Sequence, residues 1–142
     1  MTISLERTAA SLPVDFPELQ ADAIGDGHQH LTRLAAEFTL NRTMFHAMYT
    51  CRVNDELAGI GAITDEPAMT VRPAWRMRRF YVHRQFRRRE IARTIAGALL
   101  LEAKTKVFIV TVHAGDDGAA KFWEAIGFRP VKDQAWSHDA RC

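Results

Sequence analysis

The sequence lacks the features that mark a secreted, membrane-spanning or disulfide-stabilised protein. Its two cysteines, Cys51 and Cys142, are far apart, which excludes a paired-cysteine metal motif and a disulfide framework. No apolar run reaches the roughly 18 residues that a membrane span needs, and the first residues lack the apolar segment of a signal peptide. We therefore expect a cytoplasmic protein with no membrane partner.

The chain as a whole has only a small excess of positive over negative charge. The 142 residues carry a formal net charge of +2, so the general basic field of nucleic-acid-binding proteins is absent. Positive charge is local instead, because nine arginines and a single acid, Glu90, lie between Arg72 and Arg93. Five of these arginines fall in residues 84–94, RQFRRREIART.

Metal-ligand spacing is likewise missing. Of the six histidines, His28 and His30 lie close together, near Gly25 and Gly27. A structural zinc ion needs four ligands, and no third or fourth ligand is evident here. We expect no metal site.

The apolar pattern predicts helices and strands in a mixed order. The expected elements are one or two helices over 15–38 with a break near Gly25 and Gly27, a hairpin of strands 44–53 and 57–63, a strand over 74–83, a helix over 90–104, a strand over 106–113, a helix over 115–127 and a strand over 128–136. No internal repeat or low-complexity linker interrupts them. We expect one α/β domain over residues 1–142, built around one sheet, with Cys51 in its core.

The arginine stretch lies between a strand that ends at His83 and a helix that begins near residue 90. The first N–H groups of a helix have no partner within the helix and carry the positive end of its dipole, so such a junction can bind phosphate. A solvated basic face and a nucleic-acid surface are the alternatives. The near-neutral remainder of the chain disfavours nucleic acid, and we favour a compact site for a diphosphate-bearing ligand.

Two segments, FYVHRQFRRREIARTIAGALL (80–100) and VFIVTVHAGDDGAAKFWEAIGFRPV (107–131), resemble motifs of the GNAT superfamily of N-acetyltransferases. In that family, a strand ending in aliphatic-Tyr-Val leads into an Arg/Gln-x-x-Gly-x-Gly/Ala loop. The loop positions correspond here to Arg87, Glu90 and Ala92. The family's motif Asn-x-x-Ala-x-x-Phe-Tyr-x-x-x-Gly-Phe is matched by Asp116, Ala119, Phe122, Trp123, Gly127 and Phe128. The resemblance covers residues 44–131 and implies a mixed, mostly antiparallel sheet flanked by helices.

The resemblance implies acetyl-CoA as cofactor and direct attack by an amine acceptor, either a small molecule or a protein. It implies coenzyme contacts from Phe80, Tyr81, Val82, Arg87, Arg88, Arg89, Glu90, Ile91, Ala92, Asp116 and Phe122. The backbone of residues 80–82 would hold the pantetheine arm and polarise the thioester carbonyl. A homodimer is common among proteins of this kind.

Three positions depart from the family pattern. Glu90 replaces a glycine, Trp123 replaces a tyrosine that often protonates the leaving thiolate, and Arg76 and Arg78 occupy strand positions where a glutamate often serves as base. The two arginines fit either an acceptor with an acid group or pairing with surface acids. Because of these departures, an acyl-CoA-binding domain with a sensing or regulatory role is the alternative function.

The catalytic groups therefore have to come from elsewhere in the chain. A lysine-like amine is protonated at neutral pH, so a base is needed to free it. Glu37, Asp65, Glu66, His46 and His113 are the candidate bases. We select His113, Glu37 and Trp123 as the catalytic candidates.

Overall fold

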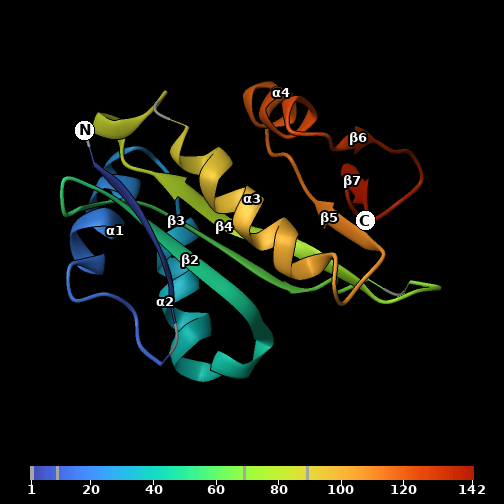
Figure 1. The fold of residues 1–142 in the computed structure, drawn as a ribbon, viewed down its shortest axis with the longest axis horizontal. Helices are drawn as coiled ribbons and strands as arrows, with labels where there is room; N and C mark the ends of the chain where they lie inside the picture. The colour runs from blue at the N-terminus through green and yellow to red at the C-terminus, as the bar shows by residue number, and fades with distance from the viewer. Residues whose placement is uncertain (1, 9, 69, 89) are drawn as a thin grey trace.

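The computed structural model, which describes residues 2–8, 10–68, 70–88 and 90–142, consists of a seven-stranded sheet with helices on both faces (Figure 1). The elements are β1 (Ile3–Arg7), α1 (Phe16–Gly25), α2 (His30–Leu40), β2 (Phe45–Val53), β3 (Glu56–Asp65), β4 (Ala74–Val82), α3 (Ile91–Ala103), β5 (Ile109–Val112), α4 (Asp117–Ala125), β6 (Arg129–Pro130) and β7 (His138–Arg141), with short 3₁₀ turns at Arg42–Met44 and Arg84–Phe86. The strand order is β1-β2-β3-β4-β5-β7-β6. The β4–β5 pair is parallel and the other pairs are antiparallel, as expected for a mixed, mostly antiparallel sheet.

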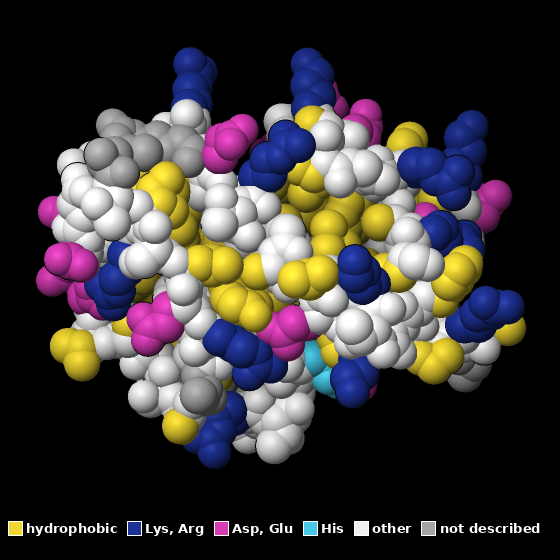
Figure 2. All heavy atoms as spheres, in the orientation of Figure 1, with side chains coloured by type: hydrophobic (Ala, Val, Ile, Leu, Met, Phe, Trp, Pro, Cys, Tyr) yellow, Lys and Arg dark blue, Asp and Glu magenta, His cyan; other side chains and the backbone are white. Residues whose placement is uncertain are grey.

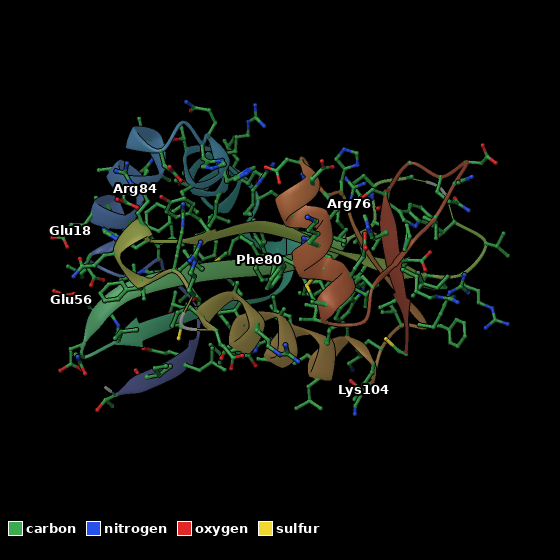
Figure 3. The ribbon with its side chains drawn as sticks, turned by 90° about the horizontal axis from the view of Figure 1, so that it is seen from above. Glu18, Glu56, Arg76, Phe80, Arg84 and Lys104 are labelled. Carbon is green, nitrogen blue, oxygen red and sulfur yellow. The ribbon has the colours of Figure 1, made fainter. Side chains whose placement is uncertain are left out.

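The sheet separates two apolar layers, and helices cover each of them. On one face, α3 and α4 cover a core that includes Ile95, Leu99 and Val110. On the other face, α1 and α2 cover a second core that includes Leu19, Leu31 and Leu34 (Figure 3). Cys51 is buried in the first core, as predicted, and burial raises the pKa of its thiol. None of the helices in the described ranges is long and apolar enough to cross a membrane.

The predicted hairpin and helix boundaries follow from local turn chemistry. Asn54 and Asp55 join β2 to β3 with positive φ angles of 49° and 70°, which matches the right-handed twist of paired strands. Gly27, at φ 82°, lies in the break between α1 and α2, and Gly127, at φ 107°, follows the end of α4. The Asp116 side chain accepts a hydrogen bond from the Ala119 N–H at 2.8 Å and caps the start of α4.

Two strand predictions need correction, and one strand was missed. The predicted strand over 128–136 is wrong: β6 covers Arg129–Pro130, and the main C-terminal strand is β7, which lies between β5 and β6. Pro130 has no N–H to continue a ladder, and the chain turns at Asp133, whose φ is 61°. The strand predicted to begin at 106 begins at Ile109, because the turns after α3 extend to Val107. β1 was not predicted, although Ile3 and Leu5 alternate with polar residues.

A bulge in β4 changes which side chains point to each face. The pairing of β3 with β4 shifts register between Ile60 and Ala62, and Arg79 opposite this point has a φ of 60°. A bulge sets two residues of one strand against one of the other, and the bulged strand bends there. As a result, the neighbouring Arg78 and Arg79 both extend toward Glu37 on α2.

Substitutions at two glycines test the packing between the sheet and α3. A Cβ added at Gly59 in β3 would lie 2.8 Å from Ile91 Cγ2 and 3.3 Å from the Tyr81 carbonyl oxygen, whereas one at Gly97 in α3 would meet nothing within 4 Å. We expect Gly59→Ala to lower the free energy of unfolding by about 1–3 kcal/mol through overpacking. Gly97→Ala, the matched control, should raise it by about 0.5–1 kcal/mol through helix propensity. Urea denaturation measures both, and an unchanged or raised stability for Gly59→Ala would contradict the packing.

Candidate functional site

Strands β4 and β5 stop pairing partway along β4. Their register runs from Ala74 and Ile109 to Arg76 and Thr111 and ends there. From Met77 to Val82, one edge of β4 therefore has no paired strand among the described residues. Backbone N–H and C=O groups along such an edge are available to a ligand.

A cleft of about 330 Å³ lies near the end of this edge, between the start of α3 and α4. Its lining combines the end of β4, the arginine loop, the first turn of α3 and one side of α4, represented by Val82, Arg88, Ile91 and Phe122. Apolar side chains show between α3 and α4 on this face (Figure 2). The cleft thus has a polar, basic end and an apolar wall.

The loop before α3 has backbone angles that favour glycine. Arg88 and Glu90 have φ angles of 66° and 59°, in the left-handed region, and Glu90 is the residue before the first turn of the helix. Its side chain makes no capping hydrogen bond, so the first N–H groups of α3 are left to solvent or a ligand. Left-handed residues next to a helix start also turn backbone N–H groups into a concave anion site. Arg89 lies outside the described residues.

Two acidic residues, Asp22 in α1 and Asp26 just after it, pair with two arginines of the loop. Arg87 forms an ion pair with Asp26, and Arg84 donates to Asp22 from Nε at 3.1 Å. The hydrogen bond from Arg87 holds the pKa of the Asp26 carboxyl below its ordinary value. Glu90 forms an ion pair with neither Arg87, whose partner is Asp26, nor Arg93. Asp22 and Asp26 were missed as partners, although their i, i+4 spacing places them on one helix face.

The three residues at the end of β4 point to different sides. Tyr81 is buried on the α1 face, and its hydroxyl donates to Asp22 Oδ2 at 2.6 Å. Burial, followed by this hydrogen bond, raises the pKa of the Tyr81 phenol. Phe80 points to the α4 face, and Val82 lines the cleft. A ligand in the cleft would therefore meet Tyr81 mainly through its backbone.

Trp123 belongs to the core rather than to the surface of the cleft. Its side chain is buried and packs edge-on against Phe80, Phe122 and Phe128, with ring centroids 4.9–5.1 Å apart. Aromatic rings favour this edge-on geometry. Phe122, by contrast, lines the cleft. Trp123 thus positions the apolar wall.

The two other catalytic candidates have different surroundings. His113 is exposed immediately after β5. Glu37 on α2 accepts two hydrogen bonds from Arg79, at 2.9 and 2.8 Å, which lower the pKa of its carboxyl. A carboxylate held in this way is a weak base. Of the remaining candidates, His46 pairs with Asp65 at 2.7 Å.

Glu66 is the most buried of the five candidate bases. Its side chain is 1% exposed and lies 2.9 Å from Arg76 Nε, and it accepts a hydrogen bond from Thr111 Oγ1 at 2.8 Å. Arg76 therefore pairs with an acid, which is one of the two outcomes that the sequence left open. That acid is buried rather than on the surface.

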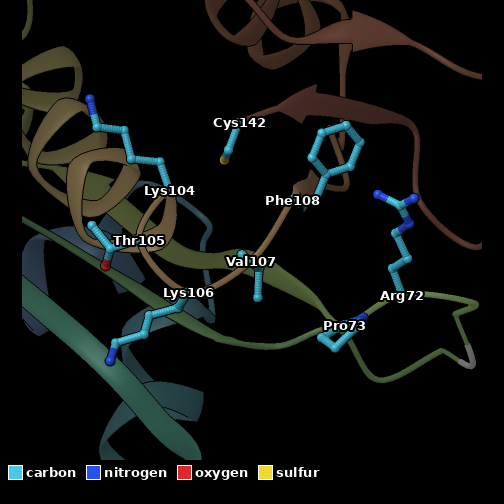
Figure 4. A pocket seen from close by; sticks show the side chains of 8 residues that line it. All are labelled: Arg72, Pro73, Lys104, Thr105, Lys106, Val107, Phe108 and Cys142. Carbon is cyan, nitrogen blue, oxygen red and sulfur yellow. The ribbon is translucent and has the colours of Figure 1, made fainter.

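A second cavity, of about 360 Å³, lies at the opposite end of α3 (Figure 4). Arg72, Lys104 and Lys106 line it together with Phe108, whose ring has the Arg72 guanidinium 5.1 Å from its centre. Lysines just past the C-terminus of α3 offset the negative end of the helix dipole. This local role accounts for their position.

Comparison with known families identifies the domain type. A family profile described as "Acetyltransferase (GNAT) domain" matches residues 20–139. That match includes the β4 edge, the arginine loop and α4. A comparison with functionally curated proteins finds no significant match.

Solved structures share the fold at low sequence identity. A protein of Exiguobacterium sp. 255-15, proposed to be an acetyltransferase, has a TM-score of 0.86 at 17% identity, covering 99% of this chain and 94% of its own. A mutant AtaT toxin bound to the C-terminus of the antitoxin AtaR and acetyl-CoA has a TM-score of 0.75 at 13% identity, covering 99% and 94%. Glucosamine-6-phosphate N-acetyltransferase of Arabidopsis thaliana has 0.68 at 13%, covering 94% and 96%.

The Glu37–Arg79 pair predicts a specific pH dependence of stability. Since the pKa of Glu37 is depressed below its ordinary value of 4.5, the pair stabilises the fold above that pH and loses its effect as pH falls through the lower, folded-state value. Glu37→Gln should lower the free energy of unfolding by about 1.5–3 kcal/mol at pH 7. The gap to the wild type should close as the pH falls well below 4.5. Glu56→Gln, at an exposed position of β3, is the control, and a gap that persists unchanged at pH 3 would contradict the pairing.

Proposed function

Because the chain belongs to the GNAT acetyltransferase family, we propose that it is an acetyl-CoA-dependent N-acetyltransferase whose acceptor is an amine on a small molecule or a protein. The observation that carries the proposal is the meeting of three features in one cleft. These are the unpaired edge of β4, the start of α3 and the apolar side of α4. Acetyl-CoA has a thioester, a diphosphate and a long amide-containing arm, which match these features in turn.

The loop and the first turn of α3 would hold the diphosphate. The N–H groups around Ile91 and Ala92 have no capping side chain, and the helix dipole favours a negative charge there. Arg88 lines the cleft and adds a guanidinium. Arg87 can exchange its partner Asp26 for phosphate, because the pair is nearly half-exposed on the arginine side and such pairs are weak. Phe122 would pack against the arm.

The unpaired edge of β4 would orient the reacting group. When bound, acetyl-CoA supplies an activated carbonyl carbon. Backbone N–H groups of residues 80–82 would hydrogen-bond the arm and stabilise negative charge as it develops on the carbonyl oxygen. Holding the amine next to the carbonyl carbon lowers the activation free energy further. Neither effect needs a particular side chain, so both tolerate the departures from the family motifs.

Proton transfer would depend on His113 and on solvent. His113 follows β5, at the open side of the strand pair, and is exposed enough to exchange protons with water. We assign it the removal of the amine proton. Because an ordinary thiol has a pKa of about 8.5, its thiolate leaves readily near neutral pH without a dedicated acid. The buried position of Trp123 agrees with a site that uses no such acid.

Coenzyme binding without turnover is the second candidate function. It is favoured by Trp123, which is in the core where the family often has a tyrosine acid, and by arginines at the positions of the usual glutamate base. A release of free thiol that requires both acetyl-CoA and an amine separates the two functions.

Calorimetry with acetyl-CoA, followed by a thiol-release assay over a panel of amines, tests the proposal. We expect one coenzyme per chain and amine-dependent thiol release. Arg88→Ala should weaken the binding of coenzyme A by about 10-fold or more, because one charge-assisted hydrogen bond is lost. The same substitution should leave the binding of pantetheine unchanged, because pantetheine lacks the diphosphate. The absence of heat at high micromolar acetyl-CoA would refute both candidate functions.

Glu90→Gly provides a separate test of the loop. Glycine adopts the left-handed angles of this position without strain, and the change removes a negative charge beside the proposed diphosphate. We expect the variant to bind coenzyme A more tightly, by about 3-fold to 10-fold. Asp133→Gly, at a similar φ of 61° far along the chain, is the matched control and should leave binding unchanged. Weaker binding by the Glu90 variant would contradict the role of this loop.

A further inference from the structure

Three arginines of β4 gather on the face of the sheet that α2 covers. Arg76, Arg78 and Arg79 have side chains that are 19%, 20% and 14% exposed. Two carboxylates, Glu66 and Glu37, are their acidic partners within ion-pair distance in the described ranges. Three guanidinium groups thus face two carboxylates, which leaves an excess positive charge in a largely buried cluster.

Both carboxylates already accept hydrogen bonds from other donors. Glu66 accepts from Thr111 Oγ1 at 2.8 Å and from the Ala68 N–H at 2.6 Å, and it forms an ion pair with Arg76 without a hydrogen bond from Arg76 Nε. Glu37 receives Arg79 through both of its oxygens. Little accepting capacity is therefore left for a third guanidinium.

Arg78 is the arginine that lacks a strong partner. Its Nη2 lies 3.7 Å from Glu37 Oε2, beyond hydrogen-bond distance, and no hydrogen bond from its side chain forms within the described residues. Burial, followed by repulsion from Arg79, lowers the pKa of its guanidinium. A largely buried charge without a hydrogen-bonded partner is costly, and its cost falls when an anion binds.

The surroundings of Arg78 reinforce the positive potential. Arg33 on α2 also approaches Glu37, and its charge contributes to the lowered pKa of that carboxyl. The pKa of His30, which begins α2, is lowered by burial first and then by His28, Arg79 and Arg33. The nearby acid Asp65 pairs with His46. An anion entering this region would meet an excess of positive charge.

Arg78 also lies close to the position where the reaction would occur. It follows the last β4–β5 pair, Arg76 and Thr111, and precedes Phe80 by two residues. Two residues of an extended strand span about 7 Å, and the bulge at Arg79 makes this separation shorter, so it lies within reach of a small amine that carries an acid group. The Arg78 side chain lies on the face of the sheet that α2 covers, opposite the face that α3 covers.

We propose that Arg78 binds the acid group, a carboxylate or a phosphate, of the amine that this protein acetylates. The inference rests on the proposed function and names the class of its acceptor. The neutral amine nitrogen forms a bond to the acetyl carbon and the carbon–sulfur bond breaks. The thiolate leaves with the electron pair, and the amine proton passes to His113 or water. The acid group takes no part in these changes and serves to place the amine.

Two pairs of amines that differ in charge test the assignment: glycine against glycinamide, and phosphoethanolamine against ethanolamine. The measured quantity is the ratio of kcat/KM for the acidic member to that for the neutral member. Because each pair also differs in amine pKa, the decisive comparison is this ratio in the wild type against the variants. We expect Arg78→Gln to lower it by about 10-fold or more, through a raised KM for the acidic member. Arg78→Lys should restore part of it.

Arg72→Gln, at the far cavity, is the control and should leave the ratio unchanged. The relative response of the carboxylate and phosphate pairs identifies the acid group. A ratio that is the same in the wild type and in Arg78→Gln, or an equal loss for acidic and neutral amines, would overturn the inference while leaving the acetyltransferase proposal intact.

A binding measurement covers the case of coenzyme binding without turnover. Phosphoethanolamine and glycine are titrated into the protein saturated with coenzyme A, and the Arg78 Nε–Hε resonance is followed by NMR. A shift that ethanolamine and glycinamide do not produce supports the inference, and no selective shift refutes it. Failure to bind acetyl-CoA at all is a different result and refutes the proposed function first.

Discussion

The divergence of β4 from β5 is the constraint on which the candidate site depends. Pairing ends at Arg76 and Thr111, so the following part of β4 keeps backbone groups that a continuous parallel pair would satisfy. The arginine loop then leads into α3 at the far end of that edge. Aromatic packing of Phe80 with Trp123 fixes α4 beside it. The cleft follows from these three placements, and each one uses the main chain or the core more than any exposed side chain.

The arginines form two groups, which differ in their place on the sheet and in their acidic partners. Asp22 in α1 and Asp26 just after it pair with Arg84 and Arg87 of the loop, whereas Glu37 of α2 and the buried Glu66 pair with Arg79 and Arg76. The first group is exposed at the surface, where the proposed diphosphate would compete with the acids for its guanidinium groups. The second group is largely buried, where an exchange would leave a carboxylate unpaired. Arg78, which lies beside that second group and only 3.7 Å from the already engaged Glu37, is therefore more informative about a ligand than the dense run of arginines in the sequence.

The departures from the family motifs become understandable as local solutions. Glu90 adopts the left-handed angles that favour glycine, at a backbone cost of order 1 kcal/mol. Its side chain remains exposed at the mouth of the cleft. Trp123 fills the core with a larger ring than tyrosine and contacts three other aromatic side chains.

The sequence by itself determined the features that depend on neighbouring residues. These are the hairpin turn at Asn54 and Asp55, the helix break near Gly27, the start of α4 at Asp116 and the resemblance that places the arginine loop before a helix. Tertiary structure decided the rest, including β1, the position of β7 between β5 and β6, and the partner of each arginine. The physical reason is range: turns and caps are local hydrogen bonds, whereas strand order and ion pairs join residues distant in sequence, whose meeting depends on how the two apolar layers pack.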